Sequence, residues 1–114
     1  MILEEIMDWN EDRGNTAYSC VREGAMLQEE VEELGDAFRN GTTVDELDAY
    51  CDIVFVAIGS MYKLLGDKQK VLDALMIVTA ANNLKGGVVD GDGKIVKEEG
   101  FAGPEGMLQE LLDA

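Results

Sequence analysis

Apolar side chains recur along most of the chain at spacings of three and four residues, which place them on one side of an α-helix. Glycine or Asn-Gly stops separate the segments that share this spacing. The pattern predicts four helices in this part of the sequence, over residues 2–12, 17–39, 43–65 and from a capping Asp67 to about Leu84. Thr43-Val44-Asp45-Glu46 has the form of a capping box and opens the third of these helices.

The third predicted helix differs from the others because apolar residues fill most of its circumference. Its main stripe includes Leu47, Cys51, Val54 and Ile58, and Phe55 is among the apolar residues that occupy the remaining faces. A helix that is apolar all round is a buried helix. We therefore expect this segment at the centre of the molecule.

The composition changes after Lys85, where glycine becomes frequent. Asp90-Gly91 and Asp92-Gly93 lie between two Val/Ile pairs, which predicts a small hairpin or ordered loop. A last short helix follows from Pro104. The sequence thus predicts an all-α, four- to five-helix bundle with a short glycine-rich loop or hairpin near the C-terminus, and residues 1–114 form a single domain.

Charge and residue types exclude several classes of function. The formal net charge of −15 would repel a nucleic-acid backbone, and the absence of histidine removes His-based triads and the usual zinc sites. The sequence has no apolar stretch of membrane-spanning length, and its acidic N-terminal segment lacks the basic charge of a signal peptide. We expect a cytoplasmic protein without a nucleic-acid or membrane partner, with Cys20 and Cys51 as reduced core residues.

Carboxylates gather beside the core on two of the predicted helices. At about 100° per residue, Glu30 lies roughly 60° and Glu33 roughly 120° from the apolar position Leu27. Asp48 and Asp52 share one side of the next helix within about 60° of each other. A short connection makes the two helices antiparallel neighbours, so these acidic edges can meet.

Several carboxylates at one place repel one another, and a divalent cation relieves that repulsion. Ligands that offer only oxygen suit Mg²⁺, or Mn²⁺, better than zinc. The alternative is that a run such as Gln28-Glu29-Glu30 is simply a solvated helix face. The pattern by itself does not name a reaction.

Two of these acidic motifs resemble the MazG-like all-α nucleoside triphosphate pyrophosphatase superfamily, which includes MazG-type enzymes, dimeric dUTPases and phosphoribosyl-ATP pyrophosphohydrolases. Residues 29–33, Glu-Glu-Val-Glu-Glu, are similar to the EExxE motif of its second helix. Asp52 fits the last aspartate of the second motif, usually ExxD. Ala49 stands where the glutamate of that motif would be, and Asp48 is a geometric substitute one turn before Asp52.

The resemblance continues toward the C-terminus. Asn82-Asn83-Leu84-Lys85 is similar to the superfamily's NxxK, and Lys94 and Lys97 lie in the glycine-rich segment. Asn82 also extends an apolar stripe, where a carboxamide requires a partner or caps the helix end. The lysines are alternatively ordinary solubilising side chains. Trp9 and Tyr18 are candidates for stacking on a base, or are core aromatics.

The resemblance implies magnesium-dependent hydrolysis of a (d)NTP to the monophosphate and pyrophosphate, as in enzymes that cleanse the nucleotide pool. It implies metal ligands at Glu30, Glu33, Asp48 and Asp52, with Glu29 orienting or deprotonating the water. Asn82, Lys85, Lys94, Lys97 and Trp9 would contact the substrate. The rivals are a phosphoribosyl-ATP pyrophosphohydrolase and a non-catalytic acidic helical interaction protein. We expect a homodimer or homotetramer, because four short helices form an incomplete pocket.

Overall fold

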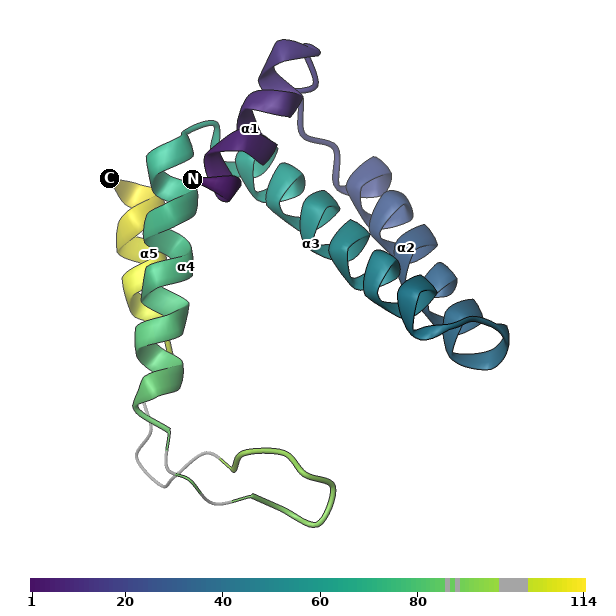
Figure 1. Ribbon diagram of the computed structural model, residues 1–114. Coiled ribbons are helices and arrows are strands. Elements are labelled where there is room, and N and C mark those ends of the chain that lie inside the picture. Colours follow the sequence, from purple (N-terminus) through teal and green to yellow (C-terminus); the bar gives the residue numbers. More distant parts are fainter. Residues whose placement is uncertain (86, 88, 97–102) are drawn as a thin grey trace. The chain divides into compact units, whose positions relative to one another are not determined.

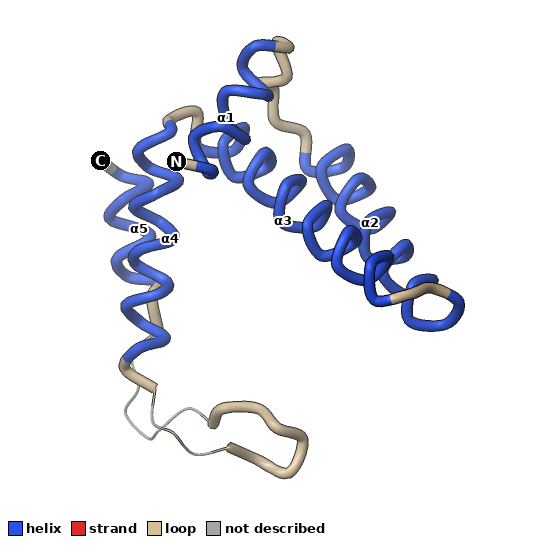
Figure 2. Tube along the Cα trace, in the orientation of Figure 1, coloured by secondary structure: helices blue, strands red, loops and turns tan. Residues whose placement is uncertain are grey.

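The computed structural model describes residues 1–85, 87, 89–96 and 103–114, and its described part is built from helices and loops without a strand (Figures 1 and 2). Its helices are α1 (Ile2–Asp12), α2 (Cys20–Asn40), α3 (Thr43–Leu65), α4 (Lys68–Asn83) and α5 (Glu105–Asp113). The all-α prediction is confirmed. The chain divides into two compact units, Met1–Lys68 and Gln69–Ala114. The single-domain organisation of residues 1–114 stays a prediction.

Local sequence signals fix the ends of the helices. The Thr42 hydroxyl accepts a hydrogen bond from the Asp45 backbone N–H, and the Asp45 carboxylate accepts one from the Thr42 N–H. The capping box of α3 therefore begins at Thr42, one residue before the predicted position. Gly66 ends α3 in the left-handed conformation at φ 68°, as predicted. Ser19 caps α2, which consequently begins three residues after the predicted Ala17.

The first unit consists of α1, α2 and α3. The close contacts within it join α3 to α2 and to α1 (Figure 1). Met7 on α1 is fully buried, and Ile58 and Ala37 are buried on α3 and α2. At the end of α1, Lys68 Nζ lies 2.6 Å from a carboxylate oxygen of Asp8 and 2.6 Å from one of Glu11. This unit carries the acidic motifs.

Two predictions about the core of this unit are wrong. Leu47 and Val54 on α3 are 63% and 53% exposed, so α3 is not buried on all sides within the first unit. Cys20 and Cys51 are free and exposed rather than core residues. The physical reason is that α3 has only α1 and α2 as helical neighbours within its unit, which leaves one apolar face uncovered.

The second unit consists mainly of α4 and α5. Val71 and Ala74 are buried on α4, and Lys70 Nζ donates a 3.0 Å hydrogen bond to the carbonyl of Ala114, after the end of α5. Between the helices, Val89 and Ile95 form an antiparallel bridge, which confirms the small hairpin in its described part. Among the described residues, no single helix is long and apolar enough to cross a membrane. Only α3 and α4 counted together reach the required length and hydropathy, and the helix is broken between them.

Close packing of α1 on α3 at Gly59 gives a prediction about stability. A Cβ atom at Gly59 would lie 3.0 Å from Asn10 Nδ2. Asn10 cannot yield easily, because it is buried and hydrogen-bonded to the Ile6 carbonyl and to Asn15. Gly59→Ala should therefore lower the free energy of unfolding by about 1 kcal/mol, since overpacking outweighs the gain in helix propensity.

The matched control for this variant is Gly24→Ala on α2, where an added Cβ would meet nothing within 4 Å. Here only helix propensity acts, so urea unfolding should show a gain of about 0.5–1 kcal/mol. Equal stabilisation by both substitutions would show that α1 does not pack on Gly59 as described.

Candidate active site

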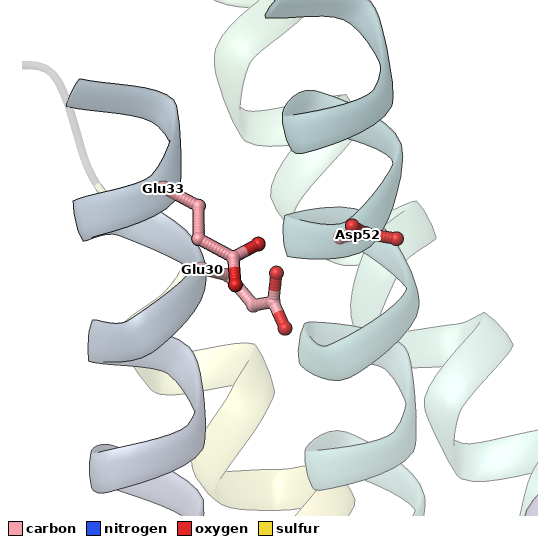
Figure 3. Close-up of side chains that lie close together, drawn as sticks. All are labelled: Glu30, Glu33 and Asp52. Atoms are coloured by element: carbon pink, nitrogen blue, oxygen red, sulfur yellow. The ribbon is translucent and has the colours of Figure 1, made fainter. Parts of the chain in front are cut away.

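Three carboxylates converge between α2 and α3. Glu30 and Glu33 project from α2 toward α3, which carries Asp52 (Figure 3). One carboxylate oxygen of each residue lies within 4.8 Å of the other two. We call Glu30, Glu33 and Asp52 the carboxylate cluster. It brings together three of the four carboxylates, all but Asp48, that the sequence placed beside the core on the two helices.

The local sequence explains this convergence. Glu30 and Glu33 are three positions apart in the sequence, so they lie on the same side of α2. The loop between the helices is only Gly41-Thr42, which makes α2 and α3 antiparallel neighbours. Ala37 on α2 and Ala49 on α3 are both buried. Because their side chains are small, they let the two helices approach closely.

The carboxyl group of Glu30 lies in an environment that disfavours its charge. Burial raises its pKa above the usual value, and the neighbouring negative charges of Glu33 and Asp52 raise it further. Its Oε2 atom is buried and has no hydrogen-bond partner among the described residues. A buried oxygen without a partner is costly, so this atom calls for a ligand.

The donor set of the cluster suits a hard divalent cation. Its ligands are carboxylate oxygens alone, which magnesium and manganese prefer over the nitrogen and sulfur ligands that zinc favours. A cation would satisfy Glu30 Oε2 and remove the repulsion that raises the Glu30 pKa. The residues therefore fit a magnesium ion.

Two predicted partners of the cluster lie outside the group of three. Glu29 is exposed on α2, and its charge adds to the negative field at Glu30. Asp48 is exposed and lines a hollow of about 320 Å³ at the α2–α3 turn, together with Glu33. Ala49 lines the same hollow. The position that carries alanine instead of the expected glutamate thus borders the hollow beside the cluster.

A family model supports this reading of the acidic motifs. The model of the phosphoribosyl-ATP pyrophosphohydrolase family matches residues 4–75, which is more than half of the chain and includes all of α2 and α3. The chain belongs to this family. It is therefore a member of the MazG-like all-α pyrophosphohydrolase superfamily. No curated protein and no solved structure matches the chain.

The family match covers the carboxylate cluster but ends before the predicted substrate-binding residues near the C-terminus. In this phosphoribosyl-ATP pyrophosphohydrolase family member, Asn82 is exposed in the last turn of α4. Lys85 is half-buried and Lys94 is exposed. Lys97 lies outside the described residues. Their roles stay predictions.

Trp9 lies in the first unit, within the family match. Its ring meets the ring of Phe55 edge-on, with centroids 5.1 Å apart, and the Arg13 guanidinium lies 4.3 Å from its centroid. Trp9 also lines an apolar hollow of about 600 Å³ between α1 and α3. Trp9 and Tyr18 are 41% and 44% exposed, so the alternative that they are core aromatics is wrong for both.

Sequence reasoning missed a buried ion pair between α2 and α3. Lys63 Nζ lies 2.7 Å from Glu23 Oε1, and the two side chains are 1% and 5% exposed. Ser60 also donates to Glu23 Oε1, at 3.1 Å. The sequence signal for this pair is Lys63, the single cation in the most apolar helix of this family member. A lysine that faces the core requires a buried anion.

The hollow beside Ala49 gives a prediction for this pyrophosphohydrolase-family site. Ala49→Glu would complete the usual ExxD motif; Ala49 is buried at the α2–α3 contact but lines the hollow, so the longer side chain would have to extend from the contact into the hollow. We expect Mn²⁺ affinity to rise about tenfold, which corresponds to roughly 1.4 kcal/mol. Without metal the variant should unfold at a lower urea concentration, because the added charge increases the repulsion. Unchanged affinity, measured by calorimetric titration, would show that the hollow is not part of the metal site.

Proposed function

We propose that the chain is a magnesium-dependent nucleoside triphosphate pyrophosphohydrolase, which converts a (d)NTP and water to the (d)NMP and pyrophosphate. The observation that carries this proposal is the carboxylate cluster with the unpartnered, buried Oε2 of Glu30. Membership of a pyrophosphohydrolase family supports the reaction class. The substrate and the metal are parts of the proposal.

In the proposed mechanism Glu30, Glu33 and Asp52 hold magnesium, and Asp48 supplies a further ligand. When bound, magnesium neutralises phosphate oxygens and makes nearby water more acidic. Glu29 orients the attacking water and accepts its proton. The water oxygen forms a bond to the α-phosphorus, while the bond from that phosphorus to the oxygen bridging to the β-phosphorus breaks. That oxygen leaves with pyrophosphate.

Trp9 is proposed to contact the base of the nucleotide. The hollow that it lines has the size of a small-molecule site, and its lining is largely apolar. Because Arg13 covers one face of the indole ring, a base would stack on the opposite face or displace the guanidinium. Asn82, Lys85, Lys94 and Lys97 are proposed to bind the phosphates or the sugar.

A second candidate substrate is phosphoribosyl-ATP, which the description of the matching family names. The same carboxylates would cleave the same type of bond in that substrate. A panel of the standard (d)NTPs and phosphoribosyl-ATP, each assayed for pyrophosphate release with magnesium, separates the two candidates. No release from any of them would refute the catalytic proposal and leave the non-catalytic acidic interaction protein.

We also propose that the chain forms a homodimer or homotetramer. The support is an apolar surface on α3, where Leu47, Tyr50 and Val54 are all more than half exposed on one side of the helix. Light scattering at micromolar concentration should give the mass of two or four chains. The mass of a single chain would contradict this prediction.

A further inference from the structure

The buried ion pair between Glu23 and Lys63 has no part in the proposed chemistry, yet it joins the two helices that carry the carboxylate cluster. Its nitrogen and oxygen atoms lie 2.7 Å apart, and Ser60 adds a second hydrogen bond to the same Glu23 oxygen. Burial alone would raise the pKa of Glu23, but the hydrogen bonds from Lys63 and Ser60 lower it. Glu23 is therefore a charged group with its partners fixed in place.

The pair and the cluster share the same sides of the two helices. On α2, Glu30 follows Glu23 by seven residues, which corresponds to two turns and an offset of only about 20°. On α3, Lys63 follows Asp52 by eleven residues, or three turns, again with an offset of about 20°. The same α2–α3 contact thus holds the ion pair near one end and the cluster farther along.

The axial spacing agrees as well. Glu23 and Glu30 are about 10.5 Å apart along α2, and Ser60 and Asp52 are about 12 Å apart along α3. Since Ser60 donates directly to Glu23, the bond places Asp52 nearly opposite Glu30 in an antiparallel pair. Lys63 reaches the same oxygen from one turn beyond Ser60, because side chains on a helix lean toward its N-terminus.

We propose that Glu23 and Lys63 are positioning residues, which set the register of α2 against α3 so that Glu30 and Glu33 lie opposite Asp52. Apolar attraction has no direction, so the apolar side chains of this contact specify the register less sharply than a paired charge does. A slip along the helix axes would separate two buried charges, which the ion pair opposes. The functional role of this register, to assemble a metal site, rests on the proposed function. The register itself does not depend on metal.

The decisive variant is the double substitution Glu23→Leu with Lys63→Met. Replacing a buried ion pair by apolar residues of similar size often leaves stability unchanged or raises it, so a folded chain is expected. Cys20 and Cys51 are exposed, and one lies on each helix, so they accept nitroxide labels without further mutation. Pulsed EPR on metal-free chains, diluted with unlabelled protein, then measures the distance between the two helices' labels.

We expect a single narrow distance distribution for the unmodified chain. In the double variant the distribution should broaden or gain a second peak displaced by several ångströms, because one turn corresponds to about 5.4 Å. Mn²⁺ affinity of the unlabelled variant should fall at least tenfold, while its urea midpoint is retained. Lys68→Met, which removes an ion-pairing lysine that contacts α1 and not α2, serves as the control and should change neither quantity.

The two proposals fail in different ways. An unchanged distance distribution in the double variant would overturn the role of Glu23 and Lys63 in setting the register. A changed distribution with full Mn²⁺ affinity would overturn their role in positioning the carboxylate cluster. No Mn²⁺ binding by the unmodified chain would instead overturn the proposed metal site. If the double variant does not fold, Glu23→Gln, which keeps a hydrogen-bond acceptor, is measured in the same way and is expected to broaden the distribution less.

Discussion

An Asp52→Asn variant is expected to lose magnesium-dependent pyrophosphate release by on the order of 10³-fold. Asp52 is the member of the carboxylate cluster on α3, so its removal leaves Glu30 and Glu33 without the cluster carboxylate that faces them from α3. A bound metal contributes several kcal/mol of charge stabilisation in the transition state, and about 1.4 kcal/mol corresponds to a tenfold change in rate. The measurement is the initial rate of pyrophosphate release with the best substrate of the nucleotide panel.

The stability of the same variant tests the cause of the loss. Without metal, Asp52→Asn should unfold at a higher urea concentration, by on the order of 0.5–1 kcal/mol, because each like-charged pair costs a few tenths of a kcal/mol. Adding magnesium should stabilise the unmodified chain but not the variant. Loss of activity with loss of folding would contradict the assignment of Asp52 as a ligand.

Glu32→Gln is the matched control for this experiment. Glu32 is an exposed acid on α2 next to Glu33, but it lies outside the cluster and accepts a 3.4 Å hydrogen bond from Gln28. The substitution removes one charge from the same helix, so activity and metal-induced stabilisation should stay within twofold of the unmodified chain. An equal loss in both variants would mean that overall charge, rather than ligation, governs activity.

The helices could be predicted from the sequence because their signals are local. Apolar spacing, the Gly66 stop and the acidic capping sequence at the start of α3 each act within a few residues, and errors were limited to a few residues at the ends. Burial was predicted less well, because it depends on which elements cover a face. Leu47 and Val54 are apolar, as core residues are, yet both are more than half exposed, because only α1 and α2 adjoin α3 within its unit.

The candidate site follows the same distinction. Helical angles and a short connection bring two acidic helix faces together, and the resemblance to a family motif singles out Glu30, Glu33 and Asp52 among their carboxylates. The same angles also select Asp48, which in the structure lines the hollow beside the cluster instead. The Glu23–Lys63 pair joins residues 40 positions apart, and a distance of this kind is not encoded in any local spacing.

Lys63→Met is expected to lower the free energy of unfolding by about 3 kcal/mol at neutral pH. Removing one partner of a buried ion pair leaves the other charge without compensation, which costs about 3–5 kcal/mol in proteins. The lower end applies here, since Ser60 and Arg22 still hydrogen-bond to Glu23. Lys68→Met removes a half-buried lysine from the surface ion pairs with Asp8 and Glu11 and should cost less than about 1 kcal/mol.

The pH dependence of this loss identifies its origin. In the unmodified chain the folded-state pKa of Glu23 is lowered, so its contribution to stability is present above the unfolded-state pKa and is lost as pH falls through the folded value. In Lys63→Met, burial of Glu23 without the lysine raises that pKa, so protonation in acid relieves the variant. Urea unfolding at about pH 7 and at successive steps below the usual glutamate pKa of about 4.3 should therefore show the two stabilities converging. A difference that stays constant down to the lowest of these pH values would mean that lost packing of the lysine stem, and not the unpaired Glu23 charge, destabilises the variant.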